Sequence, residues 1–388
     1  MSAPLIERVR ERLAGETGPL RPTVVAAAIR AESGGVLGDT EVLANLRLLQ
    51  TELTGAGILE PLLRAPGTTD VLVIAPDQVW VDDGNGLRRS DIRFPDEAAV
   101  QRLAQRLALA AGRRLDDSQP WVDGRLDGLA DAGLSVRLHA VLPPIAPAGT
   151  CLSLRVLRPA TQDLAALVQA GAIAPAAAEL IGQIVRARLA FLVSGGTGAG
   201  KTTLLSAVLG TVDAGERIVC VEDAPELAPV HPHLVRLVAR GANVEGVGEV
   251  TIRDLVRQAL RMRPDRIVVG EVRGAEVADL LSALNTGHEG GAGTVHANSP
   301  AEVPARLEAL AALGGLDRAA LHSQLAAACQ VVLHCGRDRS GRRRLGEIAL
   351  LRRGPDTLVA AQTAWQVRTG AGPGLAALHE LLAERGRS

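Results

Sequence analysis

The stretch LAFLVSGGTGAGKTTL, residues 189–204, holds the residue types and spacing that most clearly predict chemistry. An apolar run leads into a glycine-rich segment that fits G-x-x-x-x-G-K-[ST] at Gly195, Gly200, Lys201 and Thr202, and an apolar helix pattern follows. A strand, a loop and a helix in this order are what a phosphate-binding loop requires. Glycines let successive backbone N–H groups point into one concavity, and the helix N-terminus adds partial positive charge.

We therefore expect this loop to bind a nucleoside triphosphate, with Lys201 reaching the β- and γ-phosphates and the Thr202 hydroxyl binding Mg²⁺. The alternative is a glycine-rich turn that fits the pattern by chance. Lys201 argues against that alternative, because it is the only lysine among 42 Lys and Arg residues, and a planar guanidinium replaces a compact ammonium poorly. The expected nucleotide contacts are Gly195, Gly196, Thr197, Gly198, Ala199, Gly200, Lys201, Thr202 and Thr203.

Hydrolysis also needs a polarised water and groups that screen developing charge. The apolar pattern RIVVGE ends in Glu271, where a carboxylate beside the loop would hold Mg²⁺ through water or orient the attacking water. A second apolar pattern, IVCV, leads into Glu222, Asp223 and Glu226. Clustered carboxylates repel one another unless they are solvated, metal-bound or near cations, so Glu222 and Glu226 are candidate site acids. Solvated strand ends and turns are the alternative for all of them.

Two histidines lie in TGHEGGAGTVHANSP, His288 in a glycine-rich loop and His296 at the end of a strand pattern. A histidine can donate to a γ-phosphate and respond to its loss, so both are expected near the nucleotide. Structural histidines are the alternative.

Arginines from another domain or subunit could stabilise transition-state charge. Ordinary surface or ion-paired arginine is the alternative for each one, and the run 342–344 is expected to be a solvated edge strand. The candidates are Arg137, Arg155, Arg253, Arg261, Arg263 and Arg273.

The composition predicts a globular soluble protein, with 388 residues, 47% hydrophobic and 22% charged. A net charge of -1 and an aromatic content of 1% argue against direct nucleic-acid binding. Four cysteines without a C-x-x-C pair predict free thiols in a reducing cytoplasm and no zinc site. No signal peptide or spanning helix is expected, because polar residues and Pro175 interrupt the Ala-rich stretch 164–185.

The first part of the chain predicts a helical segment over 1–63, with Leu43, Leu46, Leu49 and Leu53 on one helix face. A small α+β domain is expected over 64–158. Its strands are predicted at 70–75, 79–81, 134–142 and 151–157, with a helix after Pro95.

After a linker at 159–166, buried strand patterns alternate with helices over 167–388. Such alternation predicts an α/β domain with a mostly parallel sheet and the ligand at the carboxyl ends of the strands. A turn at 337–341 between two strand-like runs and a closing helix at 375–385 follow. The strands are predicted at 189–194, 217–221, 266–269 and 293–296, and the helices at 203–211, 251–262, 275–284 and 300–312.

Four stretches in this order, GGTGAGKTT, VEDAPEL, RIVVGEVRGAE and NTGHEGGAGTVHANSP, resemble the Walker A, Asp, Walker B and His boxes of the type II and type IV secretion ATPases. The likeness covers about residues 55–350 and is closest to the Tad/CpaF branch, which powers Flp-type pilus assembly. It implies an N-domain joined by a flexible linker to a RecA-like P-loop ATPase domain. It also implies roles for Glu271 as the Walker B carboxylate, for Glu222 and Glu226 as Asp-box acids, for His288 and His296 as His-box contacts, and for Arg155 as an N-domain contribution.

Two departures from the family pattern stand out. Gly291 and Ala292 replace a commonly bulkier pair, and the hairpin RLDGLADAGLSVRL is longer than a short Asp-Gly turn. The tetracysteine zinc module of many type II secretion ATPases is absent, which favours the Tad or conjugation-like branch.

With the phosphate loop and the acids that follow the strands, this resemblance implies an ATP-hydrolysing hexameric motor that uses ATP and Mg²⁺ and powers a Tad/Flp-type pilus or a related secretion machine. The expected partners are further copies of the chain and polytopic inner-membrane platform proteins, and the expected location is the cytoplasmic face of the membrane. The alternatives are a conjugation-type traffic ATPase and a nucleotide-dependent assembly protein with little turnover.

Overall fold

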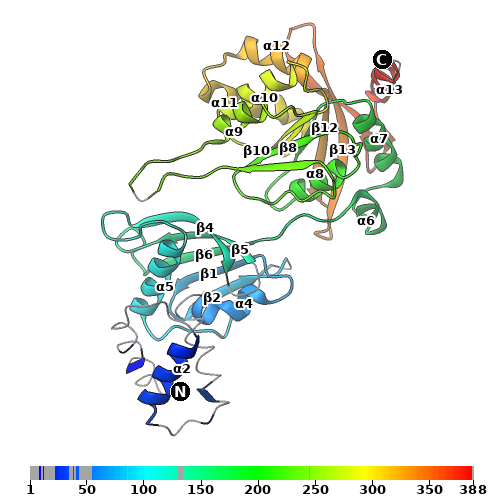
Figure 1. Cartoon of the computed structure of the whole chain (residues 1–388). Helices are drawn as coiled ribbons and strands as arrows, with labels where there is room; N and C mark the ends of the chain where they lie inside the picture. Colours follow the sequence, from blue (N-terminus) through cyan, green and yellow to red (C-terminus); the bar gives the residue numbers. More distant parts are fainter. Residues whose placement is uncertain are drawn as a thin grey trace. The chain divides into compact units, whose positions relative to one another are not determined.

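The computed structural model describes residues 8–9, 12, 22–34, 38, 41–42, 55–84, 86–129, 134–243 and 245–386. The chain divides into two compact units, Met1–Arg158 and Pro159–Ser388, which are described in turn (Figure 1). The predicted helix face with Leu43, Leu46, Leu49 and Leu53 lies outside the described residues.

The first unit is built on an antiparallel sheet of six strands in the order β3-β2-β1-β6-β5-β4. Helix α5 packs against it, and its apolar residues Val100, Leu103 and Leu107 are buried as the helical spacing predicts. The Asp96 side chain begins this helix by accepting a hydrogen bond from the Ala99 N–H at 2.7 Å. The described elements are α2 (Pro22–Glu32), η1 (Gly57–Leu59), α4 (Glu60–Arg64), β1 (Asp70–Ala75), β2 (Gln78–Asp82), β3 (Leu87–Arg89), α5 (Glu97–Ala110), β4 (Trp121–Leu129), β5 (Leu134–Val141) and β6 (Cys151–Leu157).

The sequence patterns predicted neither β3 nor β4 as a strand, and the residues of β4 show why that strand was missed. The inward positions of β4 are Val122, Gly124 and Leu126, so a glycine interrupts the apolar alternation. A Cβ atom on Gly124 would lie 2.9 Å from the Cβ atom of Ala111, at the end of α5. The glycine therefore allows the helix to pack closely on the sheet. Because it stands at an inward position, it also interrupts the alternation of apolar residues by which the sequence would reveal a strand.

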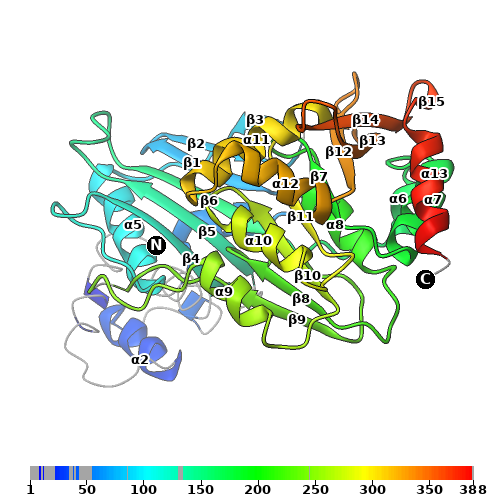
Figure 2. The ribbon, with the colours of Figure 1, turned by 90° about the horizontal axis from the view of Figure 1, so that it is seen from above.

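The second unit has a nine-stranded sheet in the order β15-β14-β13-β12-β7-β11-β10-β8-β9. Strands β12, β7, β11, β10, β8 and β9 are parallel neighbours, and β13, β14 and β15 extend the sheet in antiparallel fashion (Figure 2). The α/β prediction is confirmed. The elements are α6 (Leu164–Gln169), α7 (Pro175–Arg186), β7 (Phe191–Ser194), α8 (Lys201–Leu209), β8 (Ile218–Glu222), β9 (Leu234–Val238), α9 (Ile252–Ala259), β10 (Arg266–Val272), α10 (Glu276–Leu284), β11 (Ala292–Val295), η2 (Pro300–Glu302), α11 (Val303–Leu313), α12 (Arg318–Ala328), β12 (Val331–Arg337), β13 (Arg343–Arg353), β14 (Val359–Gln366), β15 (Gly370–Ala371) and α13 (Leu375–Arg385).

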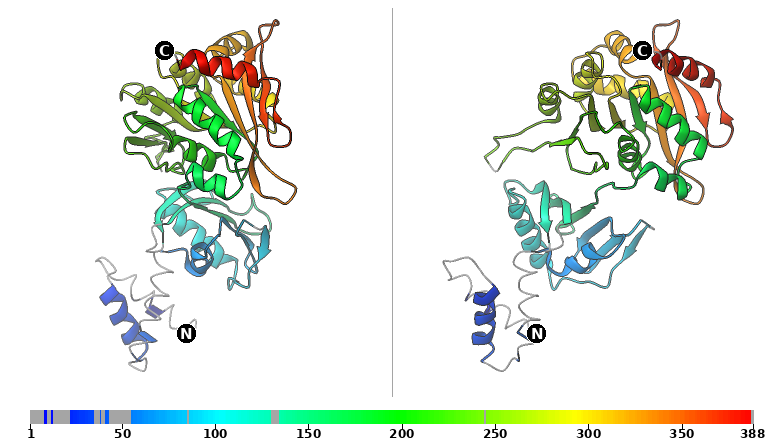
Figure 3. Two further views of the ribbon diagram at one scale, coloured as in Figure 1. Left: turned by 90° about the vertical axis from the view of Figure 1, so that its right-hand side faces the viewer. Right: turned by 45° about the vertical axis from the view of Figure 1, so that its right-hand side comes forward.

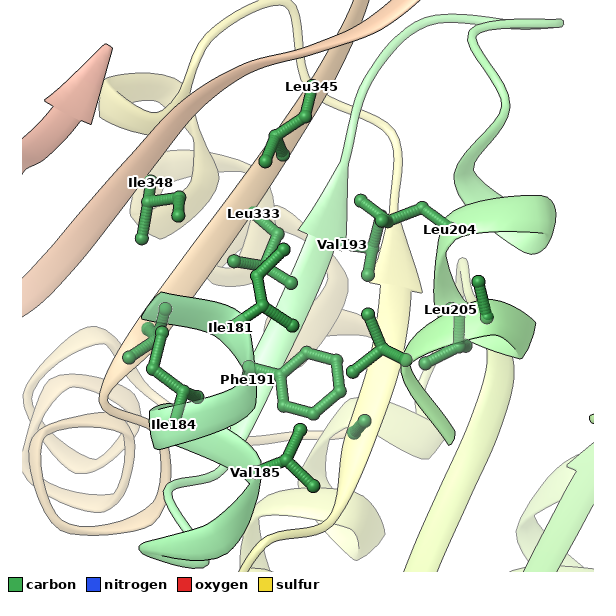
Figure 4. Close-up of a cluster of buried hydrophobic side chains, with 14 of the residues drawn as sticks. Ile181, Ile184, Val185, Phe191, Val193, Leu204, Leu205, Leu333, Leu345 and Ile348 are labelled. Atoms are coloured by element: carbon green, nitrogen blue, oxygen red, sulfur yellow. The ribbon is translucent and has the colours of Figure 1, made fainter. Parts of the chain in front are cut away.

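Helices cover both faces of this sheet, and the strands alternate between the two cores. Phe191 and Val193 of β7 pack with α7 and α8, and Figure 4 shows them beside Leu333 and Leu345 of the β12–β13 pair. Leu192, between them, belongs to the opposite core with residues of α9, α10, α11 and α12. Figure 3 shows helices on both faces of the sheet of the second unit. Burial on both faces explains why these strands read as continuous apolar runs.

The arginine run at 342–344 was predicted to lie in a solvated edge strand, and its position in the sheet agrees with this only in part. Strand β13 lies between β12 and β14. Its first residues, including Arg343 and Arg344, pair with β12 alone, because pairing with β14 begins at Glu347.

Arg266 is the most deeply buried charge of the second unit, at 1% exposure. Its guanidinium donates to both carboxylate oxygens of Glu216 at 2.9 Å, and to the backbone oxygens of Val185 and Gly290. These bonds tie the start of β10 to the end of α7 and to the segments that precede β8 and β11, because a buried guanidinium needs all its partners.

Among the described residues, none of the helices has the length and apolar character needed to cross a membrane.

Candidate active site

The carboxyl ends of four adjacent parallel strands form the candidate site. Strands β7, β11, β10 and β8 are consecutive neighbours in the sheet, so the segments that leave them emerge at the same edge. The phosphate-binding loop follows β7, His296 follows β11, Glu271 lies near the end of β10, and Glu222 ends β8. Residues from Gly195 to His296, 101 positions apart in the sequence, are thereby brought to one edge of the sheet.

The loop itself has the backbone that its glycines predict. Gly195, Gly198 and Gly200 have φ angles of 152°, 67° and 94°, values that residues other than glycine rarely adopt. The first hydrogen bond of α8 runs from the Leu204 N–H to the Gly200 carbonyl at 2.9 Å. The N–H groups of the residues before Leu204 therefore lie outside the helical ladder, where a helix N-terminus binds anions.

Lys201 is 8% exposed and stands inside this loop. Its Nζ donates to the carbonyl oxygens of Gly195 and Gly196, each at 3.1 Å, and lies 3.0 Å from His296 Nε2. Burial lowers the pKa of Lys201, and the charges of Glu271 and Glu226 work against that shift. A largely buried ammonium group is stabilised strongly by a bound anion, so this site favours a polyanion such as a triphosphate.

His296 connects Lys201 to Glu271. Its Nε2 lies 3.3 Å from Glu271 Oε1 as well as near the lysine. Burial and the Lys201 charge lower the pKa of His296, against the effect of Glu271, so the neutral ring is favoured. A neutral ring accepts from Lys201 or donates to Glu271 through this nitrogen, but does not do both.

The Thr202 hydroxyl donates to Glu226 Oε2 at 3.3 Å. A hydroxyl beside a carboxylate at the mouth of a phosphate loop fits Mg²⁺, which takes few protein oxygens and keeps waters and phosphate oxygens as its other ligands. No cluster of three or more His, Cys, Asp and Glu side chains in the described part of the chain could hold a metal ion by itself. The residues present therefore fit a Mg²⁺ ion that arrives with a nucleotide.

Glu222 is 2% exposed, and its contacts are to backbone. Its Oε1 accepts from the N–H groups of Glu226 and Leu227 at 3.1 and 2.8 Å, which shapes the loop that carries Glu226. Burial raises the pKa of Glu222 to about 7, the two backbone bonds oppose this, and the Glu226 charge adds to it. A Cβ atom on Gly270 would lie 2.8 Å from Glu222 Cγ, so the carboxyl side chain occupies space that a glycine leaves open.

The structure does not bring His288 to the phosphate loop of its own chain. The four residues of β11, Ala292–Val295, separate it from His296, and a strand of that length spans about 13 Å. His288 Nδ1 instead lies 3.2 Å from the Ala283 carbonyl oxygen at the end of α10. The intervening strand pattern was the signal that the two histidines belong to opposite edges of the sheet.

Four of the six candidate arginines form ion pairs with nearby carboxylates in the structure. Arg155 and Arg137 lie in the first unit, where they pair with Asp70 at 2.9 Å and Asp123 at 2.7 Å. Arg253 pairs with Asp279 at 2.6 Å. Arg273 is the one near the site, since it pairs with Asp223 and lies 3.9 Å from Glu271.

Strand β12 contributes contacts that the sequence patterns did not predict. The Ser194 hydroxyl lies 2.9 Å from His334 Nδ1. A Cβ atom on Gly195 would lie 2.5 Å from the Cys335 carbonyl oxygen. Because these contacts join residues about 140 positions apart, no local motif could reveal them.

Comparison with known proteins identifies the family and supports the fold. A family model described as Type II/IV secretion system protein matches residues 52–372. A "Putative conjugal transfer protein" of Mycobacterium tuberculosis is 78% identical over 350 residues, 90% of this chain and 99% of that protein. The type IV secretion system protein PtlH of Bordetella pertussis is 34% identical over 268 residues, 62% of this chain and 76% of that protein. The X-ray structure of the Legionella pneumophila ATPase DotB has the same fold, with a TM-score of 0.54 at 19% identity over 81% of this chain and 82% of that chain.

Replacing Gly195 with alanine is expected to lower the free energy of unfolding of the nucleotide-free protein by about 1–3 kcal/mol, because the added Cβ overlaps the Cys335 carbonyl. Urea unfolding measures the change. The control is G196A, since nothing lies within 4 Å of a Cβ at that position. Equal stability of the two variants would contradict the close-approach argument.

The raised pKa of Glu222, about 7, predicts a pH dependence of stability. Between its unfolded value of 4.5 and about 7 the native state holds more protons than the unfolded state, so the free energy of unfolding falls as pH rises through this window. Glu222→Gln keeps an oxygen for the two backbone N–H groups and removes the ionisation. We expect this variant to be more stable than wild type at pH 8 but not at pH 5, measured by urea unfolding at both values. A difference in the free energy of unfolding between variant and wild type that is the same at pH 5 and pH 8 would contradict this prediction.

Proposed function

The chain belongs to the type II/IV secretion system ATPase family, and from that premise we propose that it is the ATP-hydrolysing motor of a conjugation-type secretion machine. ATP hydrolysis is the activity of this family. The observation that carries the residue assignments is the chain of contacts from Lys201 through His296 to Glu271, with distances of 3.0 and 3.3 Å.

In this proposal the phosphate loop binds ATP with its backbone N–H groups, and Lys201 moves from the loop carbonyls to the β- and γ-phosphates. His296 then loses its ammonium partner and is free to hydrogen-bond the γ-phosphate or Glu271. Glu271 orients the attacking water, because it is the carboxylate that lies next to both His296 and Arg273.

Mg²⁺, when bound with the nucleotide, would screen the phosphate charge. Thr202 and Glu226 are the residues that would hold it, Glu226 directly or through water. Glu222 acts behind them, since its backbone bonds set the position of the Glu226 loop.

We also propose that copies of the chain assemble into a ring. Head-to-tail contacts in a homo-hexamer would give each site access to a neighbour's arginines. Arg155 is the candidate from the first unit, and it would have to exchange its Asp70 partner for the nucleotide. A conformational cycle of binding, hydrolysis and release would transmit force to a membrane-embedded partner.

Between the two machines that the sequence suggested, the conjugation type is better supported than the Tad pilus. A relative that is 78% identical along 90% of this chain is named for conjugal transfer, and a more distant one for type IV secretion. A Tad/Flp pilus motor would use the same site chemistry and differ in its partners.

Glu271→Gln is expected to lower the steady-state rate of phosphate release at least about a hundredfold, because the amide cannot take up a proton from water. ATP binding, measured by calorimetry, should stay within a few-fold of wild type. The matched control is Glu249→Gln, an exposed acid outside the site, which should keep full turnover. Undiminished hydrolysis by E271Q would remove Glu271 from its assigned role, and negligible turnover by the wild-type hexamer would favour an assembly protein instead.

A gene deletion that is complemented with wild type or with E271Q tests which secretion machine the motor serves. If the proposal holds, DNA transfer to recipient cells requires the catalytically intact form and surface filaments do not. Loss of filaments with unchanged DNA transfer would instead support the Tad assignment.

A further inference from the structure

The hairpin formed by β12 and β13 is fixed to the base of the phosphate loop. Strand β12 pairs with β7 in parallel up to His334 opposite Ser194, and these two side chains also contact each other. Gly195 then passes so close to the Cys335 carbonyl that only a hydrogen fits between them. Residues just beyond Cys335 must therefore run alongside the loop.

Two arginines of this hairpin lie against the loop. A Cβ atom on Gly198 would lie 3.4 Å from Arg337 Nη2, and one on Gly200 would lie 3.4 Å from Arg343 Cδ. The two arginines are opposite each other in the β12–β13 ladder. Both side chains are exposed, so the guanidinium groups border the loop and remain accessible.

The hairpin leaves these two charges without a carboxylate partner in the described part of the chain. Asp338 is the acid of the turn, but it is already engaged. Its Oδ1 accepts from the N–H groups of Ser340 and Arg342 at 2.9 and 3.0 Å, and its Oδ2 pairs with Arg344 at 3.1 Å. Arg337 donates only to the Gly341 carbonyl oxygen, at 2.9 Å.

The strand order separates the two sides of the loop. Strand β7 has β11 on one side and β12 on the other, so His296 and Glu271 flank the loop on the β11 side and the arginines flank it on the β12 side. The end of a triphosphate that reacts must face Glu271. The α-phosphate and the nucleoside then extend toward the hairpin.

We propose that Arg337 and Arg343 form the nucleoside-side wall of the nucleotide site, where their guanidinium groups bind the phosphates shared by ATP and ADP and position the ribose. This inference rests on the proposed function and adds two binding residues to it. Guanidinium groups suit the task, since they form charge-assisted, bidentate bonds with phosphate oxygens.

A cavity continues from this wall. It is open to solvent, measures about 740 Å³ and is lined by Arg337, Asp338, Arg339, Ser340 and Arg368. Arg337 belongs both to this lining and to the contact with the loop. In this proposal the nucleoside portion extends over this open hollow.

The test compares nucleotide binding by full-length R337Q/R343Q and wild type, using calorimetric titration with MgATP and with ADP. We expect the Kd of the double variant to rise about tenfold or more for both nucleotides, because two charge-assisted bonds are lost. Equal losses are expected, since ATP and ADP share the phosphates at this end. The matched control is Arg352→Gln, the same change at an exposed position near the other end of β13, which should bind like wild type.

Binding within twofold of wild type would overturn the proposal, and so would a loss confined to ATP, which would place the arginines at the γ-phosphate. If R337Q/R343Q unfolds at a lower temperature than wild type, the titrations are repeated at a temperature at which both proteins are fully folded. Binding that is still weakened about tenfold there supports the wall, and binding equal to that of wild type overturns it. Failure of the wild type to bind either nucleotide would be a failure of the proposed function itself.

Discussion

The burial of the Lys201 ammonium is the constraint on which the rest of the second unit depends. A positive charge at 8% exposure needs acceptors on every side. The loop supplies two carbonyl oxygens, β11 supplies His296, and Glu271 and Glu226 supply opposite charge at longer range. These groups come from four strands, so the sheet must hold its carboxyl edge in register for the lysine to be tolerated in the folded state.

Small residues make that register possible. Gly195 lets the loop pass over the Cys335 carbonyl, and Gly270 leaves room for the Glu222 side chain. Each is a close approach that a Cβ atom would prevent, and each sets one side of the site. At the opposite edge, the buried Arg266 holds strand ends together through Glu216 and two carbonyl groups. The sheet is thus tied at its amino-terminal edge and carries chemistry at its carboxyl edge.

Glu222 at the end of β8 and Glu226 just after it show how similar residues take different roles according to their position. Glu222 faces inward, bonds to backbone and has a raised pKa, which suits a residue that shapes a loop. Glu226, four residues later, reaches the Thr202 hydroxyl at the mouth of the phosphate loop. The same division separates His296 from His288, since one follows β11 and the other precedes it.

The amino-acid sequence by itself determined the phosphate loop, the alternation of strands and helices, and the acids and histidine that follow the strands, because each depends on a local pattern of a few residues. It did not reveal β4, where Gly124 breaks the alternation, or β9, which lies at the sheet edge with half-buried residues. Only the tertiary structure decided which strands are neighbours. That order brings His296 to Lys201, leaves His288 at the other edge, and sets Arg337 and Arg343 beside the loop, because contacts between residues more than a hundred positions apart follow from sheet packing and from no local motif.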